Sequence, residues 1–134
     1  MNEIPLFSSL SIKSITLRNR VVLSPMCQYK AKDGMINDWH LQHYSRFAFS
    51  GLGAAFIEAT GVLPEGRIGH GCTGIWSDDH IEGLSKIAKT FKEYNCVSGI
   101  QLAHAGRKAS FLRPWDGASP INKDDKREPA WQTI

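Results

Sequence analysis

The feature that most constrains the fold is the alternation of strand-like and helix-like segments along the chain. Short apolar runs at residues 21–23, 54–62 and 97–106 are typical of buried strands. Between them lie two segments with apolar residues at helical spacing, one opening at Asn37-Asp38 and one near Ser77. The predicted order is β-α-β-α-β. Such an alternation indicates an α/β protein with a parallel sheet.

Each predicted helix has one apolar face. The face of the first helix consists of Leu41, Tyr44, Phe47 and Ala48, and Gly51 ends that helix. The face of the second consists of Ile81, Leu84, Ile87, Ala88 and Phe91. Asp79 and Glu82 have the spacing of a capping box, and Glu82 precedes Lys86 by four residues, which favours an ion pair along the helix.

The flanks of this α/β region have other patterns. Residues 6–20 alternate apolar and polar side chains around a turn, which predicts a β-hairpin. Residues 107–134 are rich in Pro, Asp and Lys without periodicity, which predicts a loop-rich tail. With 134 residues in all, we expect one domain: the hairpin 6–20, the strands and helices of 21–106, and the tail 107–134.

Two parallel architectures compete, the open doubly wound sheet and the closed (β/α)8 barrel. A dinucleotide-binding doubly wound domain has a Gly-rich turn after its first strand, but residues 24–29 read SPMCQY, and GLGAAF at 51–56 lacks the third glycine. In a barrel, polar residues gather at the carboxyl ends of successive strands. Here those ends are 24–27, 58–60 and 101–107. The barrel is favoured, although it needs about 250 residues, so only its first part is expected.

Composition excludes several classes of protein. The net charge of +3 comes from basic residues spread among acidic ones, which gives no support to nucleic-acid binding. Three cysteines without a C-x-x-C pair suggest neither a disulfide framework nor a zinc site, and no metal site is assigned. No apolar run is long enough to span a membrane and no secretory signal is recognisable, so we expect no membrane partner and a cytoplasmic location.

Six ordered blocks of the sequence resemble the Old Yellow Enzyme family of flavin-dependent ene-reductases. They are LRNR (17–20), SPMCQY (24–29), HLQHYSR (40–46), EATGVLPEGRI (58–68), GIWSDDHIEG (74–83) and IQLAHAGRKA (100–109). Cys27 stands where other branches of the family have threonine, which makes the chain similar to the bacterial xenobiotic-reductase branch, also called thermophilic-like. The resemblance implies an α/β fold: the N-terminal part of an FMN-containing TIM barrel, capped by an N-terminal hairpin and incomplete in this chain.

The resemblance also implies roles for individual residues. Those expected to bind FMN are Ser24, Pro25, Met26 and Cys27 along the ring, Ala59 at the second strand's end and Gln101 at the pyrimidine edge. A primary amide suits that edge because it offers both a donor and an acceptor. Tyr29 resembles the phenol that lines the substrate side. Proline lacks an N–H and fixes φ, so Pro25 ends the strand pairing where the chain crosses the ring.

The implied reaction uses NADPH or NADH to reduce FMN, and the reduced flavin then passes hydride to the β-carbon of a small enone or enal. The protein binds, orients and tunes the cofactor. We therefore give Cys27 a tuning role and not that of a nucleophile.

The residues that the resemblance implies for catalysis are expected outside this chain. The family's carbonyl-binding pair, proton-donating tyrosine, flavin arginine and phosphate loops come from later strands. We expect that tyrosine to lie beyond Ile134, the last residue of the sequence. No catalytic residue is therefore assigned in this chain, and the chain alone is expected to be inactive.

Other interpretations stay open. Cys27 would be a core thiol if its flanking residues did not match the family. His40 and His43 have metal-ligand spacing, but without a third ligand nearby we expect them to pack the helix. The chain is alternatively a non-catalytic partial barrel acting in binding or assembly, or part of a related FMN reductase of enoyl thioesters. Unpaired strand edges favour association, so a homo-oligomer is among the expected states.

Overall fold

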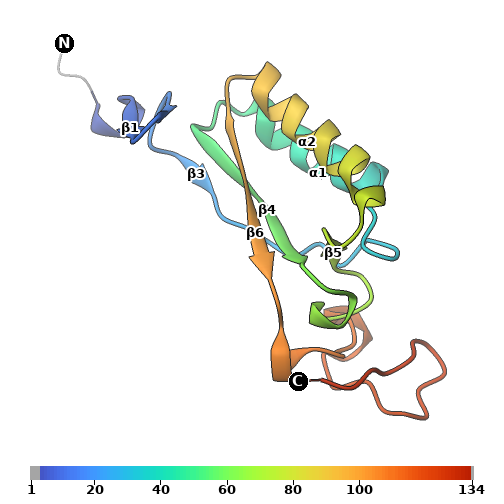
Figure 1. The fold of residues 1–134 in the computed structure, drawn as a ribbon. Coiled ribbons are helices and arrows are strands. Elements are labelled where there is room, and N and C mark those ends of the chain that lie inside the picture. Colours follow the sequence, from blue (N-terminus) through green and yellow to red (C-terminus); the bar gives the residue numbers. More distant parts are fainter. Residues whose placement is uncertain (1–3, 134) are drawn as a thin grey trace.

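The protein is built around one long central strand, β4 (Ala54–Gly61), in a computed structural model that describes residues 4–133. β3 (Val22–Leu23) pairs with the start of β4, and β5 (Thr73–Gly74) pairs with its end. β6 (Val97–Ala103) pairs with β4 along its length, and all three pairings are parallel (Figure 1). The predicted order of strands and helices is therefore present, with the short β5 added.

Two helices cover one face of this sheet. α1 (Asp38–Phe49) and α2 (Ile81–Glu93) lie side by side on the same side of β4 and β6 (Figure 1). The core between helices and sheet consists of Tyr44, Ala48, Ala55, Ile57, Ile87, Phe91 and Cys96. Most of the predicted apolar helix positions face this core, but Ile81, the first residue of α2, is 56% exposed.

The start of each helix is fixed by a local cap. Asn37 caps α1: its side chain accepts from the Trp39 N–H, and the His40 ring accepts from the Asn37 N–H. A 3-10 turn, Asp78–His80, precedes α2. The capping box there is formed by Ser77 and His80, so the predicted box of Asp79 and Glu82 is wrong.

His80, the last residue of this 3-10 turn, is buried. Its Nδ1 accepts from the Ser77 N–H, and its Nε2 lies 3.1 Å from the Asp33 carbonyl oxygen. Its ring also meets the Trp76 ring edge-on, with 4.6 Å between centroids. These contacts explain the burial, since each ring nitrogen has a polar partner while the ring packs on an indole.

The predicted hairpin is present as β1 (Leu10–Ile12) and β2 (Ile15–Leu17), an antiparallel pair. Lys13 has φ +52° in its turn. The residues after β2 tie the hairpin to the sheet: Arg18 donates to the Leu52 carbonyl and Asn19 to the Gly51 carbonyl. This contact leaves no room for a side chain at Gly53, where a Cβ would lie 2.1 Å from the Asn19 carbonyl oxygen.

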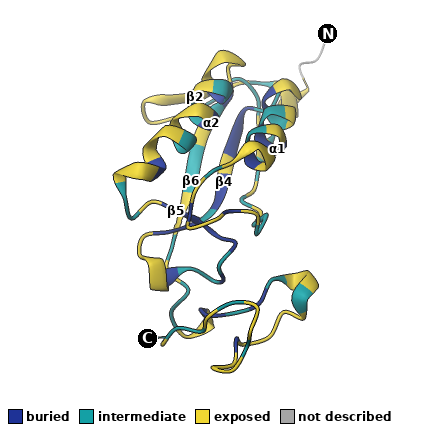
Figure 2. Cartoon of the chain, turned by 90° about the vertical axis from the view of Figure 1, so that its right-hand side faces the viewer, coloured by how far each residue is buried: buried dark blue, intermediate teal, exposed yellow. Residues whose placement is uncertain are grey.

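The face of the sheet away from the helices is open. Phe56 of β4 and Met26 after β3 are 39% and 45% exposed. β6 was expected to be covered on both faces, but none of its residues is buried (Figure 2). Gln101 and Leu102, successive residues that face opposite sides of the strand, are both exposed. That expectation is wrong for residues 4–133, in which β6 pairs only with β4 and α1 and α2 lie on a single face.

The tail after β6 has no strand or helix longer than a 3-10 turn among its described residues, but it is packed. Four of its side chains are buried: Ala109, Ser110, Leu112 and Ile121. Arg113 donates to the Tyr29 carbonyl at 3.2 Å, and the Trp131 indole donates to the Glu65 carbonyl at 2.9 Å. The tail therefore folds back on the loops at the carboxyl ends of the strands.

Ile134, beyond which we expect the family's proton-donating tyrosine, lies outside the described residues. The placement of that tyrosine, and with it the assignment of no catalytic residue to this chain, stays a prediction from the resemblance.

Candidate functional site

The sequence-predicted cofactor residues meet at the carboxyl ends of three strands. Ser24, Pro25, Met26 and Cys27 follow directly after β3 and belong to no strand or helix; Ser24 and Met26 are exposed. Ala59 lies in β4 and is paired with Gln101 of β6. Ala59 is half-buried and Gln101 is exposed. The Cys27 thiol lies at the Ala59 backbone, which brings the β3 exit to the same place.

A β-bulge in β4 decides which way Ala59 points. Ile57 pairs with Ile100 and Ala59 pairs with Gln101, so Glu58 is the extra residue. Strict alternation from the buried Ala55 and Ile57 would turn Ala59 toward the helices. Because of the bulge, Glu58 is buried on the helix side and Ala59 faces the open side together with Gln101.

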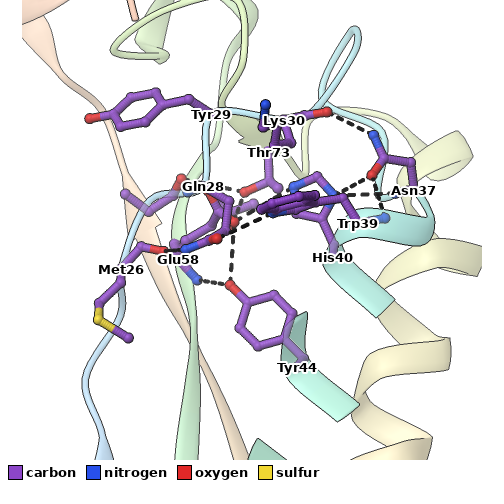
Figure 3. Close-up of polar contacts among 12 residues, drawn as sticks. Met26, Gln28, Tyr29, Lys30, Asn37, Trp39, His40, Tyr44, Glu58 and Thr73 are labelled. Carbon is purple, nitrogen blue, oxygen red and sulfur yellow. Dashed lines mark hydrogen bonds and ion pairs between the residues drawn. The ribbon is translucent and has the colours of Figure 1, made fainter. Parts of the chain in front are cut away.

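Glu58 is wholly buried and is held by polar groups from two segments (Figure 3). Its Oε2 accepts from the Gln28 N–H at 2.8 Å. Its Oε1 accepts from the Tyr44 hydroxyl at 3.4 Å and lies 3.7 Å from His40 Nε2. The Tyr44 oxygen in turn accepts from the Glu58 N–H at 2.8 Å. The carboxyl thus joins the loop after β3 to α1.

Burial dominates the electrostatics of this group. It raises the pKa of Glu58 to about 7, against the hydrogen bonds from the Gln28 N–H and the Tyr44 hydroxyl, which lower it. Burial also raises the pKa of Tyr44, lowers the pKa of His40 to about 4, and thereby favours a neutral imidazole. The site therefore holds a carboxyl that titrates near neutral pH beside groups that stay uncharged there.

Cys27 is half-buried next to this group. Burial raises the pKa of its thiol, and the negative charge of Glu58 raises it further. Hydrogen bonding with the Ala59 backbone and the Tyr29 side chain acts in the opposite direction. The thiol form is favoured, which suits a polarisable neighbour of a ligand better than a nucleophile.

Tyr29 points away from Glu58 toward the open side (Figure 3). It has φ +53°, an uncommon conformation for a bulky residue. Arg113 holds its carbonyl oxygen, and the Trp115 ring meets its ring edge-on with 6.3 Å between centroids. Burial raises the pKa of its phenol to about 12. The conformation is held from the tail, and it presents the phenol beside the ends of the strands.

His40 and His43 are buried in the packing of α1, as expected from the sequence. His43 meets the rings of Tyr44 and Phe47 edge-on. Among residues 4–133, no group of three or more His, Cys, Asp or Glu side chains is arranged to hold a metal ion. In the same residues, no helix is long and apolar enough to span a membrane.

Sequence reasoning placed Glu58 only within the strand end 58–60 and Tyr44 only on the apolar face of the first helix, and it did not predict their contact. The available signal was a single acid inside the otherwise apolar run AAFIEATGV. A carboxyl in a buried strand requires hydrogen-bond partners. The identity of these partners depends on tertiary contacts between residues 14 and 30 positions apart.

Comparison with curated proteins shows close relatives among bacterial NADPH dehydrogenases. The chain is 45% identical over 129 residues to the NADPH dehydrogenase of Halalkalibacterium halodurans, covering 95% of this chain and 38% of the relative. It is 49% identical over 106 residues to that of Bacillus subtilis, covering 78% of this chain and 31% of the relative. The chain thus spans well under half the length of these relatives.

Solved structures of similar fold confirm the expected architecture. The old yellow enzyme from Trypanosoma cruzi matches with a TM-score of 0.71 and 31% identity, over 78% of this chain and 28% of that one. The old yellow enzyme homologue from Zymomonas mobilis matches with a TM-score of 0.77 over 89% of this chain and 38% of that one; at 22% identity it shows the fold alone. The chain has the fold of the N-terminal part of these TIM barrels.

The family model agrees with the motifs noted in the sequence. It matches residues 5–131, from the segment before the hairpin to the tail. The predicted resemblance to the Old Yellow Enzyme family is confirmed. The chain belongs to the NADH:flavin oxidoreductase / NADH oxidase family.

Proposed function

We propose that this chain forms the N-terminal part of the flavin site of an FMN-dependent oxidoreductase. The enzyme would use NADPH or NADH to reduce the C=C bond of small α,β-unsaturated carbonyl compounds. FMN and a nicotinamide nucleotide are the cofactors that family membership implies. The observation that carries the proposal is the pairing of Ala59 with Gln101 on the open face, beside the Cys27 thiol.

The residues present fit a flat aromatic ring. Ala59 has a small side chain on the open face, so a planar group can approach the backbone there closely. The exposed Gln101 amide offers a donor and an acceptor, which suits a ring edge carrying both carbonyl and N–H groups. Met26, next to Cys27 in the chain, is 45% exposed and offers an apolar, polarisable surface.

The proposed role of this chain's residues is to bind and orient. Gln101 would hold the pyrimidine edge, Ala59 and the segment 24–27 would lie along the ring, and Tyr29 would border the substrate. Cys27 would tune the ring through its polarisable sulfur. The chemistry that FMN supplies when bound is hydride transfer from the nicotinamide to the substrate's β-carbon.

A second candidate function is supported by the uncovered apolar side chains. Phe7, before the hairpin, and Leu102, near the end of β6, are each 62% exposed. Exposed apolar patches and open strand edges favour association with another chain. A partial barrel acting in binding or assembly would explain them without any catalysis by this chain.

The first test is titration of the purified chain with FMN, followed by removal of free cofactor. Retained flavin with altered absorbance and fluorescence is the expected result if the three strand ends form a usable part of the site. No retention by a folded chain would mean that these residues do not bind FMN by themselves. It would favour the second candidate unless the next test restores binding.

The second test places the same residues in a complete barrel. Residues 5–131 would replace the matching segment of the Halalkalibacterium halodurans NADPH dehydrogenase, which is 45% identical. We expect the hybrid to retain FMN and to reduce a cyclic enone with NADPH or NADH. A folded hybrid that binds no FMN would contradict the proposal. Flavin binding without enone reduction would contradict the substrate class alone.

A further inference from the structure

We propose that Glu58 is a positioning residue that fixes the turn Met26–Tyr29 at the open face by holding the Gln28 backbone N–H. Glu58 does not itself reach the open face. It lies on the helix side of the sheet and would act through Gln28 on the neighbouring Cys27 and Tyr29. The inference rests on the proposed function only in calling this turn part of a flavin site.

The geometry shows a carboxyl that joins elements otherwise separate in sequence. Its Oε2 accepts from the Gln28 N–H at 2.8 Å, and its Oε1 faces the Tyr44 hydroxyl and His40 Nε2 on α1 (Figure 3). The residues of the turn belong to no strand or helix and have no strand partner. A side chain must therefore supply the acceptor that a sheet would otherwise provide.

The bulge in β4 links the hydrogen bond between Glu58 and Gln28 to the arrangement of the open face. Glu58 is itself the extra residue of the bulge. Its insertion turns Ala59 toward the open face and places the Glu58 side chain on the helix side, against the turn. A second hydrogen bond stiffens the turn, because the Gln28 side chain donates to the Met26 carbonyl at 2.9 Å. The Trp39 indole on α1 donates to the Gln28 side-chain oxygen at 3.2 Å. Gln28 is thus the point at which α1 and β4 both hold the turn.

His40 Nε2 gives independent support. It is buried and has no hydrogen-bond partner among the described residues. It lies 3.7 Å from Glu58 Oε1, so α1 presents a second polar side chain to the carboxyl beside Tyr44. The titratable groups whose charges lie near Glu58 are His40 and Tyr44 from α1, Cys27 and Tyr29 from the turn, and Cys72 from the segment before β5.

The rate at which iodoacetamide alkylates Cys27 reports how firmly the turn is held, and this measurement needs no flavin. Cys72 and Cys96 are only 1% and 3% exposed, so the fast reaction of the folded chain is expected at Cys27. C27S should abolish it. E58A should accelerate alkylation roughly fivefold at high pH, where the thiol is fully ionised, because the turn loses one hydrogen bond.

E58Q distinguishes positioning from mere packing. Its amide oxygen still accepts from the Gln28 N–H, so the plateau rate should stay within about twofold of the wild-type rate. Its lost charge no longer opposes ionisation of Cys27, so the midpoint of the pH profile should move to lower pH. E82A, at an exposed glutamate of α2, is the matched control and should change neither quantity.

Hydrogen exchange keeps the proposal testable if E58A fails to fold. In the wild-type chain the Gln28 amide should be protected, and protection should persist in E58Q. An unprotected Gln28 amide in the wild-type chain, or a folded E58A with wild-type alkylation, would overturn the proposal. Failure to retain FMN would count against the proposed function alone, because neither measurement involves flavin.

Discussion

The Tyr44 hydroxyl and Glu58 are joined twice: the oxygen accepts from the Glu58 backbone N–H at 2.8 Å and faces the Glu58 carboxyl at 3.4 Å. The bulge makes this arrangement necessary, because the backbone N–H of the extra residue has no partner strand at that point. Tyr44 therefore stabilises both the bulge in β4 and the side chain that the bulge turns inward.

Y44F should destabilise the chain by about 1–3 kcal/mol, because it leaves a buried N–H without an acceptor. Chemical denaturation followed by circular dichroism measures the change. Y94F is the matched control, since Tyr94 is 45% exposed and its ring would keep the edge-on contact with Phe49. Equal midpoints for Y44F and Y94F would contradict the role given to the Tyr44 hydroxyl.

Glu58 and His40 should give opposite pH dependences of stability. The pKa of Glu58 rises from 4.5 to about 7 on folding, so the folded chain holds a proton that the unfolded chain has lost, and stability falls as pH rises through this window. The pKa of His40 falls from 6.5 to about 4, so its contribution to stability is lost as pH falls through that window. Between pH 4.5 and 6.5 the two slopes should nearly cancel.

Single variants should reveal each slope. In E58Q only the His40 slope remains, and the free energy of unfolding should decrease on acidification from about pH 6.5 by up to roughly 3 kcal/mol. In H40Q the free energy of unfolding should instead increase by a similar amount on acidification, because only the Glu58 slope remains. Glutamine is also a favoured residue at the third helical position of a capping box. Denaturation at several pH values measures both. Flat curves for both variants would show that neither residue titrates as described.

Gln101 should affect flavin retention without affecting stability. It is exposed, so Q101A should leave the denaturation midpoint unchanged while weakening FMN binding about five- to tenfold through lost hydrogen bonds. Fluorescence titration of the chain or of the hybrid enzyme measures this. Q42A, at an exposed position of α1, is the control. Equal FMN affinity for Q101A and Q42A would remove Gln101 from the proposed site.

The helices and β4 were predictable because their signals are local. Asn37 opens a helix whose apolar spacing extends to Ala48, and the run AAFIEATGV is long enough to indicate a buried strand. The burial of β6 was overestimated for a different reason. Its apolar composition predicts covered faces, but the sequence pattern does not show which segments supply the cover.

The bulge and the left-handed Tyr29 were not predictable from local pattern. A one-residue bulge leaves the composition of β4 unchanged and appears only when its register with β6 is known. Tyr29 is held at positive φ by contacts with Arg113 and Trp115, more than eighty residues later. The family motif placed residues 24–29 near the site, whereas Glu58 needed the three-dimensional contacts.

Arg113 ties the tail to the turn and should control its local opening. Its Nε donates to the Tyr29 carbonyl at 3.2 Å, and its Nη1 lies 2.6 Å from Glu128 Oε1. A charge-assisted hydrogen bond of this kind contributes about 1.5–3 kcal/mol, so R113A should speed subtilisin cleavage within residues 114–133 roughly tenfold or more. R107A, at an exposed arginine of the 3-10 turn Gly106–Lys108, is the matched control. Mass spectrometry locates the cuts, and equal cleavage rates for the two variants would mean that packing of Leu112 and Ile121, not Arg113, holds the tail in place.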